Sequence, residues 1–93
     1  MQLRFYIDPE TGTPHLHKHG VSESEVEEVL GNAGEDRAGR ENARIAIGRA
    51  LSGRLLRVVY VPDPQPDSYF VITAFELRGK AALAYRRRRR RKR

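Results

Sequence analysis

The stretch ARIAIGRALSGRLLRVVYV, residues 43–61, predicts two β-strands that fold back on each other. β-Branched and large aliphatic residues dominate both arms, and such residues favour strands. The pair Ser52-Gly53 lies between the arms, and a Ser-Gly pair between two strand-like runs is a hairpin signal. We therefore expect this hairpin at the centre of a small sheet.

The length of the turn decides which side chains share a face. A two-residue loop at Ser52 and Gly53 pairs Ile47 with Val58, and paired residues lie on the same face of a sheet. In this register the large apolar residues of both arms lie on one face, which is the expected core side. The opposite face carries small residues and is expected to be open and cationic.

Four arginines of the hairpin are placed by this register. Arg44 and Arg57 are expected on the open face, where they are candidates for binding phosphate. Arg49 and Arg54 are expected at the turn end of the core side, where their apolar stems can cover the core edge while their guanidinium groups reach water.

The remaining segments predict a small α+β domain. Alternating apolar residues indicate a strand at 2–7, and a capping box of Ser22 and Glu25 indicates a helix at 23–30. A mobile loop, a third long strand and a short helix are predicted at residues 32–42, 69–77 and 80–85. The order strand, helix, three strands, helix favours an antiparallel sheet of about four strands with the helices on one face.

Positive charge is concentrated at the C-terminal end. Eight of the 18 basic residues lie at 86–93, which leaves 10 basic and 12 acidic residues over 1–85. We expect one domain at residues 1–85 and a basic, disordered tail at 86–93, because such a run repels itself and buries nothing. The residues of this tail expected to bind nucleic acid are Arg86, Arg87, Arg88, Arg89, Arg90, Arg91, Lys92 and Arg93.

Composition excludes several protein classes. With 93 residues the chain has room for one modest core, and without cysteine it has neither disulfides nor thiolate metal sites. The first residues lack the apolar core of a signal peptide, and no apolar run is long enough to span a membrane. We expect a cytoplasmic protein with no membrane partner.

Three stretches resemble the BrnT-type toxins of the RelE-like ribonuclease group. They are KHGVS at 18–22 ahead of a Glu-rich helix, the hairpin at 43–61, and VITAFELRGKAALAY at 71–85. The resemblance rests on their order and spacing, since no single motif is diagnostic. It implies a RelE-like fold, mRNA cleavage that inhibits translation, neither metal nor cofactor, and a cognate antitoxin protein of a type II toxin–antitoxin system. A looser set of uncharacterised small proteins shares the strand and helix order and implies a fold alone.

The resemblance also assigns roles to individual residues. Arg44, Arg49 and Arg54 match arginines of the BrnT hairpin. His19 matches the histidine ahead of the helix and completes the candidate catalytic set. Phe75 stands where the family pattern usually has an arginine. If that arginine stabilises the cleaved phosphate, this chain is a slow, altered or degenerate nuclease.

These residue types suit metal-free RNA cleavage, but each has a structural alternative. Cleavage requires activation of the ribose 2′-hydroxyl, stabilisation of charge at the phosphate and protonation of the leaving oxygen. Arginine binds phosphate bidentately, and histidine titrates near neutral pH. In the alternative interpretation the arginines are solvated strand residues and His19 only caps or packs locally.

The histidines and aromatic residues leave further alternatives open. His15, His17 and His19 would share one side of an extended segment, which also permits zinc binding. Tyr85 either matches the terminal tyrosine of RelE-like toxins or packs on the sheet. The aromatic residues of the third strand are assigned to the core or its rim rather than to base stacking, because no basic residues alternate with them; they are Tyr69, Phe70 and Phe75.

The sequence thus favours a toxin-type endoribonuclease that acts on mRNA or at the ribosome. The alternative is a non-catalytic module that binds nucleic acid or the ribosome. A third class is a structural protein whose sheet pairs with a partner chain.

Overall fold

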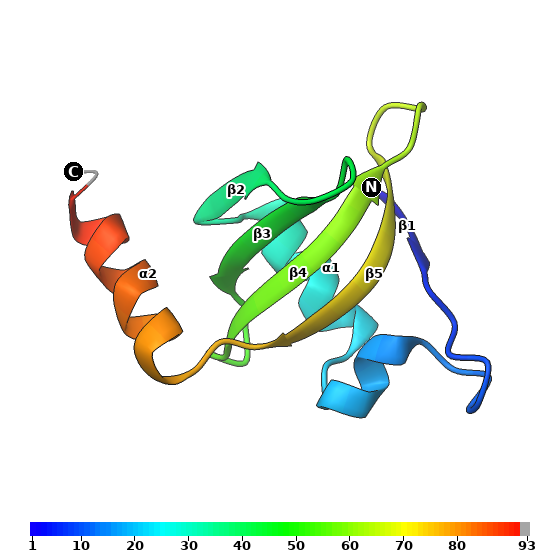
Figure 1. Ribbon diagram of the computed structural model, residues 1–93, viewed down its shortest axis with the longest axis horizontal. Coiled ribbons are helices and arrows are strands. Elements are labelled where there is room, and N and C mark those ends of the chain that lie inside the picture. The colour runs from blue at the N-terminus through cyan, green and yellow to red at the C-terminus, as the bar shows by residue number, and fades with distance from the viewer. Residues whose placement is uncertain (92–93) are drawn as a thin grey trace.

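The computed structural model describes residues 1–91, which form one five-stranded mixed sheet with helices on both of its faces (Figure 1). The strands are β1 (Gln2–Phe5), β2 (Glu35–Ala38), β3 (Arg44–Arg49), β4 (Leu55–Pro62) and β5 (Ser68–Glu76). The helices are the 3₁₀ helix η1 (His15–His19) and the α-helices α1 (Glu23–Gly31) and α2 (Gly79–Arg91). The predicted α+β class is confirmed, with one strand more than expected. Within the described residues no helix is long and apolar enough to cross a membrane.

Two edge strands set the sheet apart from the expected four-stranded antiparallel arrangement. The strand order is β1-β5-β4-β3-β2, and β1 pairs with β5 in parallel. β2 pairs antiparallel with β3 inside the segment predicted to be a mobile loop, so that prediction is wrong for residues 35–38. Its residues are mostly polar, and an edge strand tolerates polar side chains because it is not covered on all sides.

The central hairpin forms, but its register is shifted by one residue from the predicted one. The backbone N–H of Ala50 donates to the carbonyl oxygen of Arg54 at 2.9 Å, so residues 51–53 form the loop. Gly53 has a φ of 95°, a left-handed conformation that commonly closes a three-residue hairpin loop. The predicted two-residue loop is therefore wrong, and Ile47 lies opposite Arg57.

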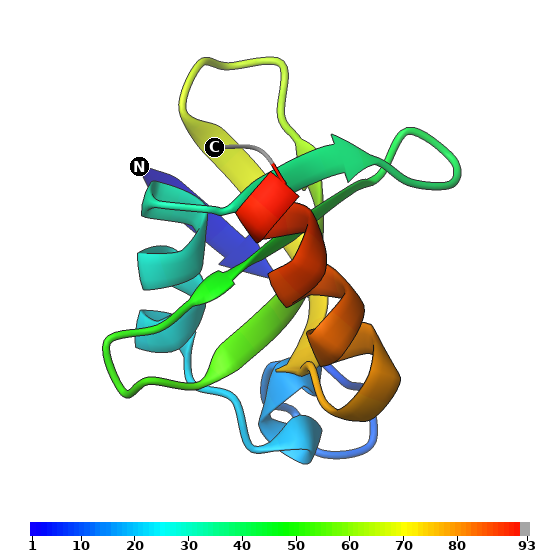
Figure 2. The same ribbon diagram turned by 90° about the vertical axis from the view of Figure 1, so that its left-hand side faces the viewer.

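The shifted register divides the apolar residues between the two faces of the sheet, and the two α-helices lie on opposite sides (Figure 2). The first buried cluster, under α1, includes Val26, Val29, Ala46, Leu56, Val58 and Val71. The second, under α2, contains Ile47, Leu55, Leu77, Ala82 and Tyr85. The expectation that the helices pack on one face is wrong, because a one-residue shift moves alternate side chains to the other face.

Helix α1 begins as predicted and also holds the hairpin turn. Ser22 Oγ accepts a hydrogen bond from the Glu25 backbone N–H at 3.2 Å, and the Glu25 carboxylate accepts one from the Ser22 N–H at 3.1 Å. This confirms the capping box. Glu25 also accepts from the Ser52 hydroxyl, and Glu28 accepts from the Leu51 N–H, both at 2.9 Å. The acidic face of α1 therefore fixes the loop that sets the register.

Helix α2 takes up most of the segment predicted to be a disordered tail. The short helix predicted at 80–85 extends through Arg91, so residues 86–91 are helical. Lys92 and Arg93 lie outside the described residues.

Contacts with the start of β2 anchor this arginine-rich helix. Arg88 Nε lies 2.5 Å from Glu35 Oε2, and Arg89 Nη1 donates to the carbonyl oxygen of Gly34 at 2.8 Å. Tyr85 packs against Gly34 so closely that a Cβ at residue 34 would collide with the Tyr85 hydroxyl. Composition alone does not show this anchoring, because the partners lie about 50 residues away in the chain.

A buried carboxylate fastens η1 to the turn that follows β1. Asp8 Oδ2 lies 2.7 Å from Lys18 Nζ and 3.2 Å from His15 Nδ1. Asp8 Oδ1 accepts a hydrogen bond from the Glu10 backbone N–H at 2.9 Å. The hydrogen bond from Lys18, followed by that from Glu10, lowers the pKa of Asp8 to about 2.

We expect this carboxylate to make the protein sensitive to acid. The folded pKa of Asp8 lies below the ordinary value of about 3.9, so its contribution to stability is fully present above pH 4 and is lost as the pH falls through 2. Urea unfolding between pH 5 and 2 measures this, with Asp8→Asn expected to show a shallower loss of stability than the unmodified protein. The exposed Glu41→Gln is the control. Identical pH profiles for Asp8→Asn and the unmodified protein would contradict the assignment.

Candidate nucleic-acid interface

The face of the sheet that packs against α2 is only partly covered, and we call its uncovered part the open face. In Figure 1 α1 lies behind the sheet and α2 lies beside β3, so no described helix covers β4 and β5 toward the viewer. Most side chains here are half-buried, in contrast to the buried ones under α1. The open face consists of Arg4, Arg37, Ile45, Arg57, Val59, Val61, Phe70, Ile72, Thr73 and Phe75.

Two arginine–phenylalanine pairs lie across neighbouring strands of the open face. Arg4 Cζ lies 5.0 Å from the ring centroid of Phe70, and Arg57 Cζ lies 5.7 Å from that of Phe75. The assignment of these rings away from base stacking rests on the absence of basic residues along β5, which holds, but neighbouring strands supply the cations that β5 lacks. The arginines come from β1 and β4, which flank β5, rather than from β5 itself. Rings flanked by cations are typical of surfaces on which unpaired bases stack.

A groove of about 550 Å³ opens beside Arg57, between the open face and the β2–β3 hairpin. The Arg57 guanidinium has no hydrogen bond or ion pair to any residue within 1–91, and its Nε is buried. Thr73 Oγ1, one strand further along and opposite Val59, is also buried without a partner in that range. The groove is lined by Ala38, Gly39, Arg40, Ala43, Ile45, Arg57, Val59 and Ile72.

The outer side of α2 carries unpaired positive charge, and we call it the arginine surface. It consists of Arg86, Arg87, Arg90 and Arg91. All four side chains are exposed, and none of them makes an ion pair or hydrogen bond to another described residue. Because Arg88 and Arg89 anchor the helix, the helix presents these four guanidinium groups on a fixed scaffold.

The arginines assigned to catalysis by resemblance are not brought together. Arg44 and Arg49 lie at opposite ends of β3, about 16 Å apart at roughly 3.3 Å per residue. Arg49 Nη1 donates to the carbonyl oxygen of Gly53 at 2.7 Å. Arg54 Nη1 donates to a backbone carbonyl just ahead of α1 at 3.0 Å. All three therefore have structural partners.

The shifted register also separates the arginines predicted to share a face. Arg57 lies on the open face, but Arg44 lies on the α1 side, where Arg44 Nε contacts Asp36 Oδ1 at 2.8 Å. The Tyr60 hydroxyl donates to the same carboxylate. Burial, and then Asp36, raises the pKa of Tyr60 to about 12. The prediction that Arg44 and Arg57 share one face is therefore wrong. The prediction that Arg49 and Arg54 share the core side is wrong too, because they lie on opposite faces.

The three histidines lie in η1 rather than in an extended segment, so they do not share the side that an extended segment would give them. His17 Nε2 contacts Glu23 Oε1 at 2.6 Å. The His19 ring lies 5.4 Å from that of His15 and 6.0 Å from that of Phe75, so His19 and Arg57 both border Phe75. Within residues 1–91 no group of three or more His, Cys, Asp or Glu side chains is placed to hold a metal ion.

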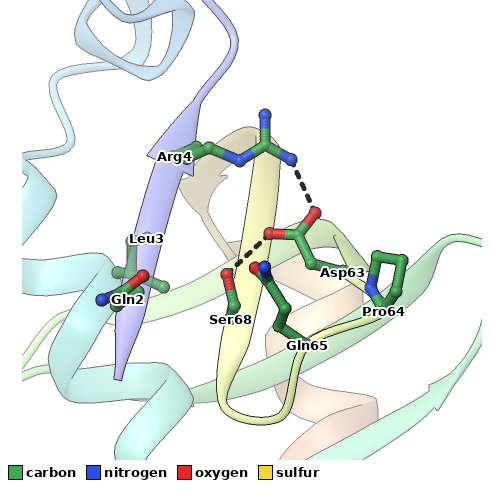
Figure 3. Close-up of a pocket in the computed structure, with 7 residues that line it drawn as sticks. All are labelled: Gln2, Leu3, Arg4, Asp63, Pro64, Gln65 and Ser68. Atoms are coloured by element: carbon green, nitrogen blue, oxygen red, sulfur yellow. Dashed lines mark hydrogen bonds and ion pairs between the residues drawn. The ribbon is translucent and has the colours of Figure 1, made fainter.

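A second hollow lies at the β1 edge, and Arg4 lines it together with Asp63 and Ser68 (Figure 3). Arg4 Nη2 donates to Asp63 Oδ1 at 2.6 Å, and the Ser68 hydroxyl donates to Asp63 Oδ2 at 2.7 Å. Arg4, followed by Ser68, lowers the pKa of Asp63. The ion pair keeps the Arg4 guanidinium near Phe70, but it also offsets part of its charge.

Of the predicted RNA contacts, the structure therefore places Arg57 on the open face beside the groove, with His19 and Arg57 both bordering Phe75, and it places Arg86, Arg87, Arg90 and Arg91 on the arginine surface. Arg4, Phe70 and the groove were not predicted, because they depend on the β1–β5 pairing and on the length of the hairpin loop. Neither protein-family models, nor curated proteins, nor solved structures give a match to this chain.

Proposed function

We propose that the protein binds single-stranded RNA across the open face and along the arginine surface, without cleaving it. The observation that carries the proposal is the two arginine–phenylalanine pairs on an uncovered sheet face. A base stacked on either ring would also lie near a guanidinium group, which contributes through charge and through planar contact. The resemblance to BrnT-type toxins supports RNA as the nucleic acid.

The distribution of charge supports the same ligand. The strand residues of the open face include three arginines, Arg4, Arg37 and Arg57, while Glu76 and Asp36 point to the α1 side. Glu35 shares the α2 side but is bound to Arg88. The arginine surface adds four cations that can neutralise phosphates.

We expect a short single-stranded RNA to bind more tightly than a duplex of the same length. Stacking on Phe70 and Phe75 requires bases that are free of their own stack, whereas phosphate contacts alone would favour the duplex with its higher charge density. Fluorescence anisotropy with labelled 12-nucleotide RNAs at several salt concentrations measures both affinities, and gel analysis of the same samples shows whether the RNA stays intact. Equal or tighter binding of the duplex would contradict base stacking.

The toxin-type endoribonuclease with a RelE-like fold is the second candidate. One observation favours it, namely that His19 and Arg57 both border Phe75 and so place a proton donor near a cation. The dispersed arginines of the hairpin argue against it. Three results together would favour the nuclease over the binding module. They are RNA fragments in the binding samples, growth arrest on expression, and neutralisation of that arrest by a cognate antitoxin.

A further inference from the structure

We propose that the groove beside Arg57 holds one unpaired guanine of the bound RNA, an inference that rests on the proposed RNA binding. The groove is the one described above, and residues of the β2–β3 hairpin and of β4 and β5 line it. None of its lining residues is acidic, and two of them are arginines. It therefore suits an anionic ligand with an apolar, flat portion.

The apolar walls indicate a base rather than a phosphate alone. Ile45, Val59 and Ile72 come from three adjacent strands, and each is half-buried, so their side chains offer an apolar surface that is only partly covered. A phosphate would leave this surface exposed, whereas a base would cover it. Only a base that is neither paired nor stacked in a helix can enter, which ties the groove to single-stranded RNA.

The polar groups at the groove indicate which base fits. Arg40 and Arg57 supply only hydrogen-bond donors. Guanine presents two neighbouring acceptors, O6 and N7, which match the fork of an arginine. Adenine presents one acceptor and one donor at the corresponding edge, and that donor would face the guanidinium donors. Guanine therefore satisfies the groove better than adenine.

Arg57 is the arginine expected to read this edge. Its Nε is buried, so the two Nη nitrogens are the part of the fork that remains for a ligand. Its guanidinium lies against the Phe75 ring, which restricts its orientation. No ion pair within residues 1–91 competes for it, in contrast to Arg44 with Asp36 and Arg88 with Glu35.

The test compares RNA octamers of uridine that carry one central substituted nucleotide. We expect guanosine at this position to bind about tenfold more tightly than adenosine, cytidine or uridine, as for one bidentate arginine–guanine pair. Replacement of guanine by 7-deazaguanine removes the N7 acceptor and should abolish most of this preference. Inosine keeps O6 and N7 and should bind like guanosine.

Variants then assign the preference to a residue. Arg57→Lys keeps the charge but loses the fork, so the ratio of guanosine to uridine affinity should fall to about one, whatever change the altered contact with Phe75 brings to oligouridine binding itself. Arg49→Lys is the matched control, because Arg49 has the same side-chain chemistry but is bound to the Gly53 carbonyl outside the groove. Thermal melting of both variants checks that the fold is kept.

The outcomes separate this inference from the proposed function. A protein that binds oligouridine tightly but shows no preference for guanosine overturns the guanine site and leaves RNA binding in place. A preference that persists in Arg57→Lys, or that is insensitive to 7-deazaguanine, also overturns the site. If no single-stranded RNA binds, the proposed function fails and the inference fails with it.

Discussion

Replacing Arg86, Arg87, Arg90 and Arg91 together with glutamine is expected to lower the affinity for single-stranded RNA about 100-fold or more at 0.1 M salt. Each phosphate contact to a single strand contributes about −0.7 to the slope of log K against log salt concentration, so four contacts contribute about −2.8. Glutamine removes the charge but forms helices about as well as arginine, so α2 should be retained. Salt-titrated anisotropy measures both the affinity and the slope.

Two comparisons show whether this loss comes from the arginine surface itself. Arg44→Gln removes a positive charge on the α1 side and should change the slope by less than one unit, because Arg44 is bound to Asp36 away from the RNA. Arg88→Gln breaks the ion pair with Glu35 and should mainly lower the melting temperature. An unchanged salt slope in the fourfold variant would show that α2 does not contact the RNA.

The second large effect is expected from Phe70→Leu combined with Phe75→Leu. Leucine keeps most of the apolar volume of these half-buried residues but has no aromatic face. Base–aromatic stacking contributes about 1–3 kcal/mol per base, so losing both platforms should weaken single-stranded RNA binding at least about 30-fold. Anisotropy should show this loss with little change in the salt slope, since no charge is removed.

An aromatic residue on the other side of β5 provides the control for this variant. Tyr69 packs against Tyr60 on the α1 side, with ring centroids 5.4 Å apart. Tyr69→Leu should lower stability and leave RNA affinity unchanged once the protein is shown to be folded. If Tyr69→Leu weakens binding as much as the double phenylalanine variant, the loss reflects the fold rather than the open face.

Local sequence signals predicted the elements of this fold well. The capping box of Ser22 and Glu25, the two arms of the hairpin and the third long strand all depend on residues close in sequence, and the structure confirms them. The alanine-rich segment predicted the start of α2 and left its continuation into the arginines open, whereas composition favoured a disordered tail there. The α+β class followed from these elements alone.

The face of each side chain was not predictable, because it depends on one residue of loop length. The pair Ser52-Gly53 is compatible with a two-residue turn, but contacts from Glu25 and Glu28 of α1 hold a loop of residues 51–53 instead. Those contacts span more than 20 positions of the chain. The alternation of residues along a strand is the same in either register, so it does not reveal a one-residue shift. In β3 the shift placed the residues expected on the open face on the α1 side, and those expected in the core on the α2 side.

The candidate site was predicted less well, because it is formed by residues that become neighbours only when different strands pair. The sequence predicted that Arg57 lies on the open face, and it does. On that side of the sheet β3 carries Ile45 and Ile47 rather than the expected small residues. The pairing of Arg4 with Phe70 requires β1 to lie parallel to β5, and nothing in either segment alone specifies that partner. The arginines chosen by resemblance instead serve the loop, the start of α1 and the β2 edge.

The parallel pairing of β1 with β5 has a thermodynamic consequence for the bound state. β1 has four residues and lies at the edge of the sheet, and short edge elements open at lower free energy than the core. Opening of β1 would remove Arg4 from Phe70, so a ligand that needs both can bind only the closed form. Bound RNA would then raise the free energy of local opening by RT ln(1 + [RNA]/Kd). Bound RNA would therefore stabilise the pairing of β1 with β5, and so hold the N-terminal strand in the sheet.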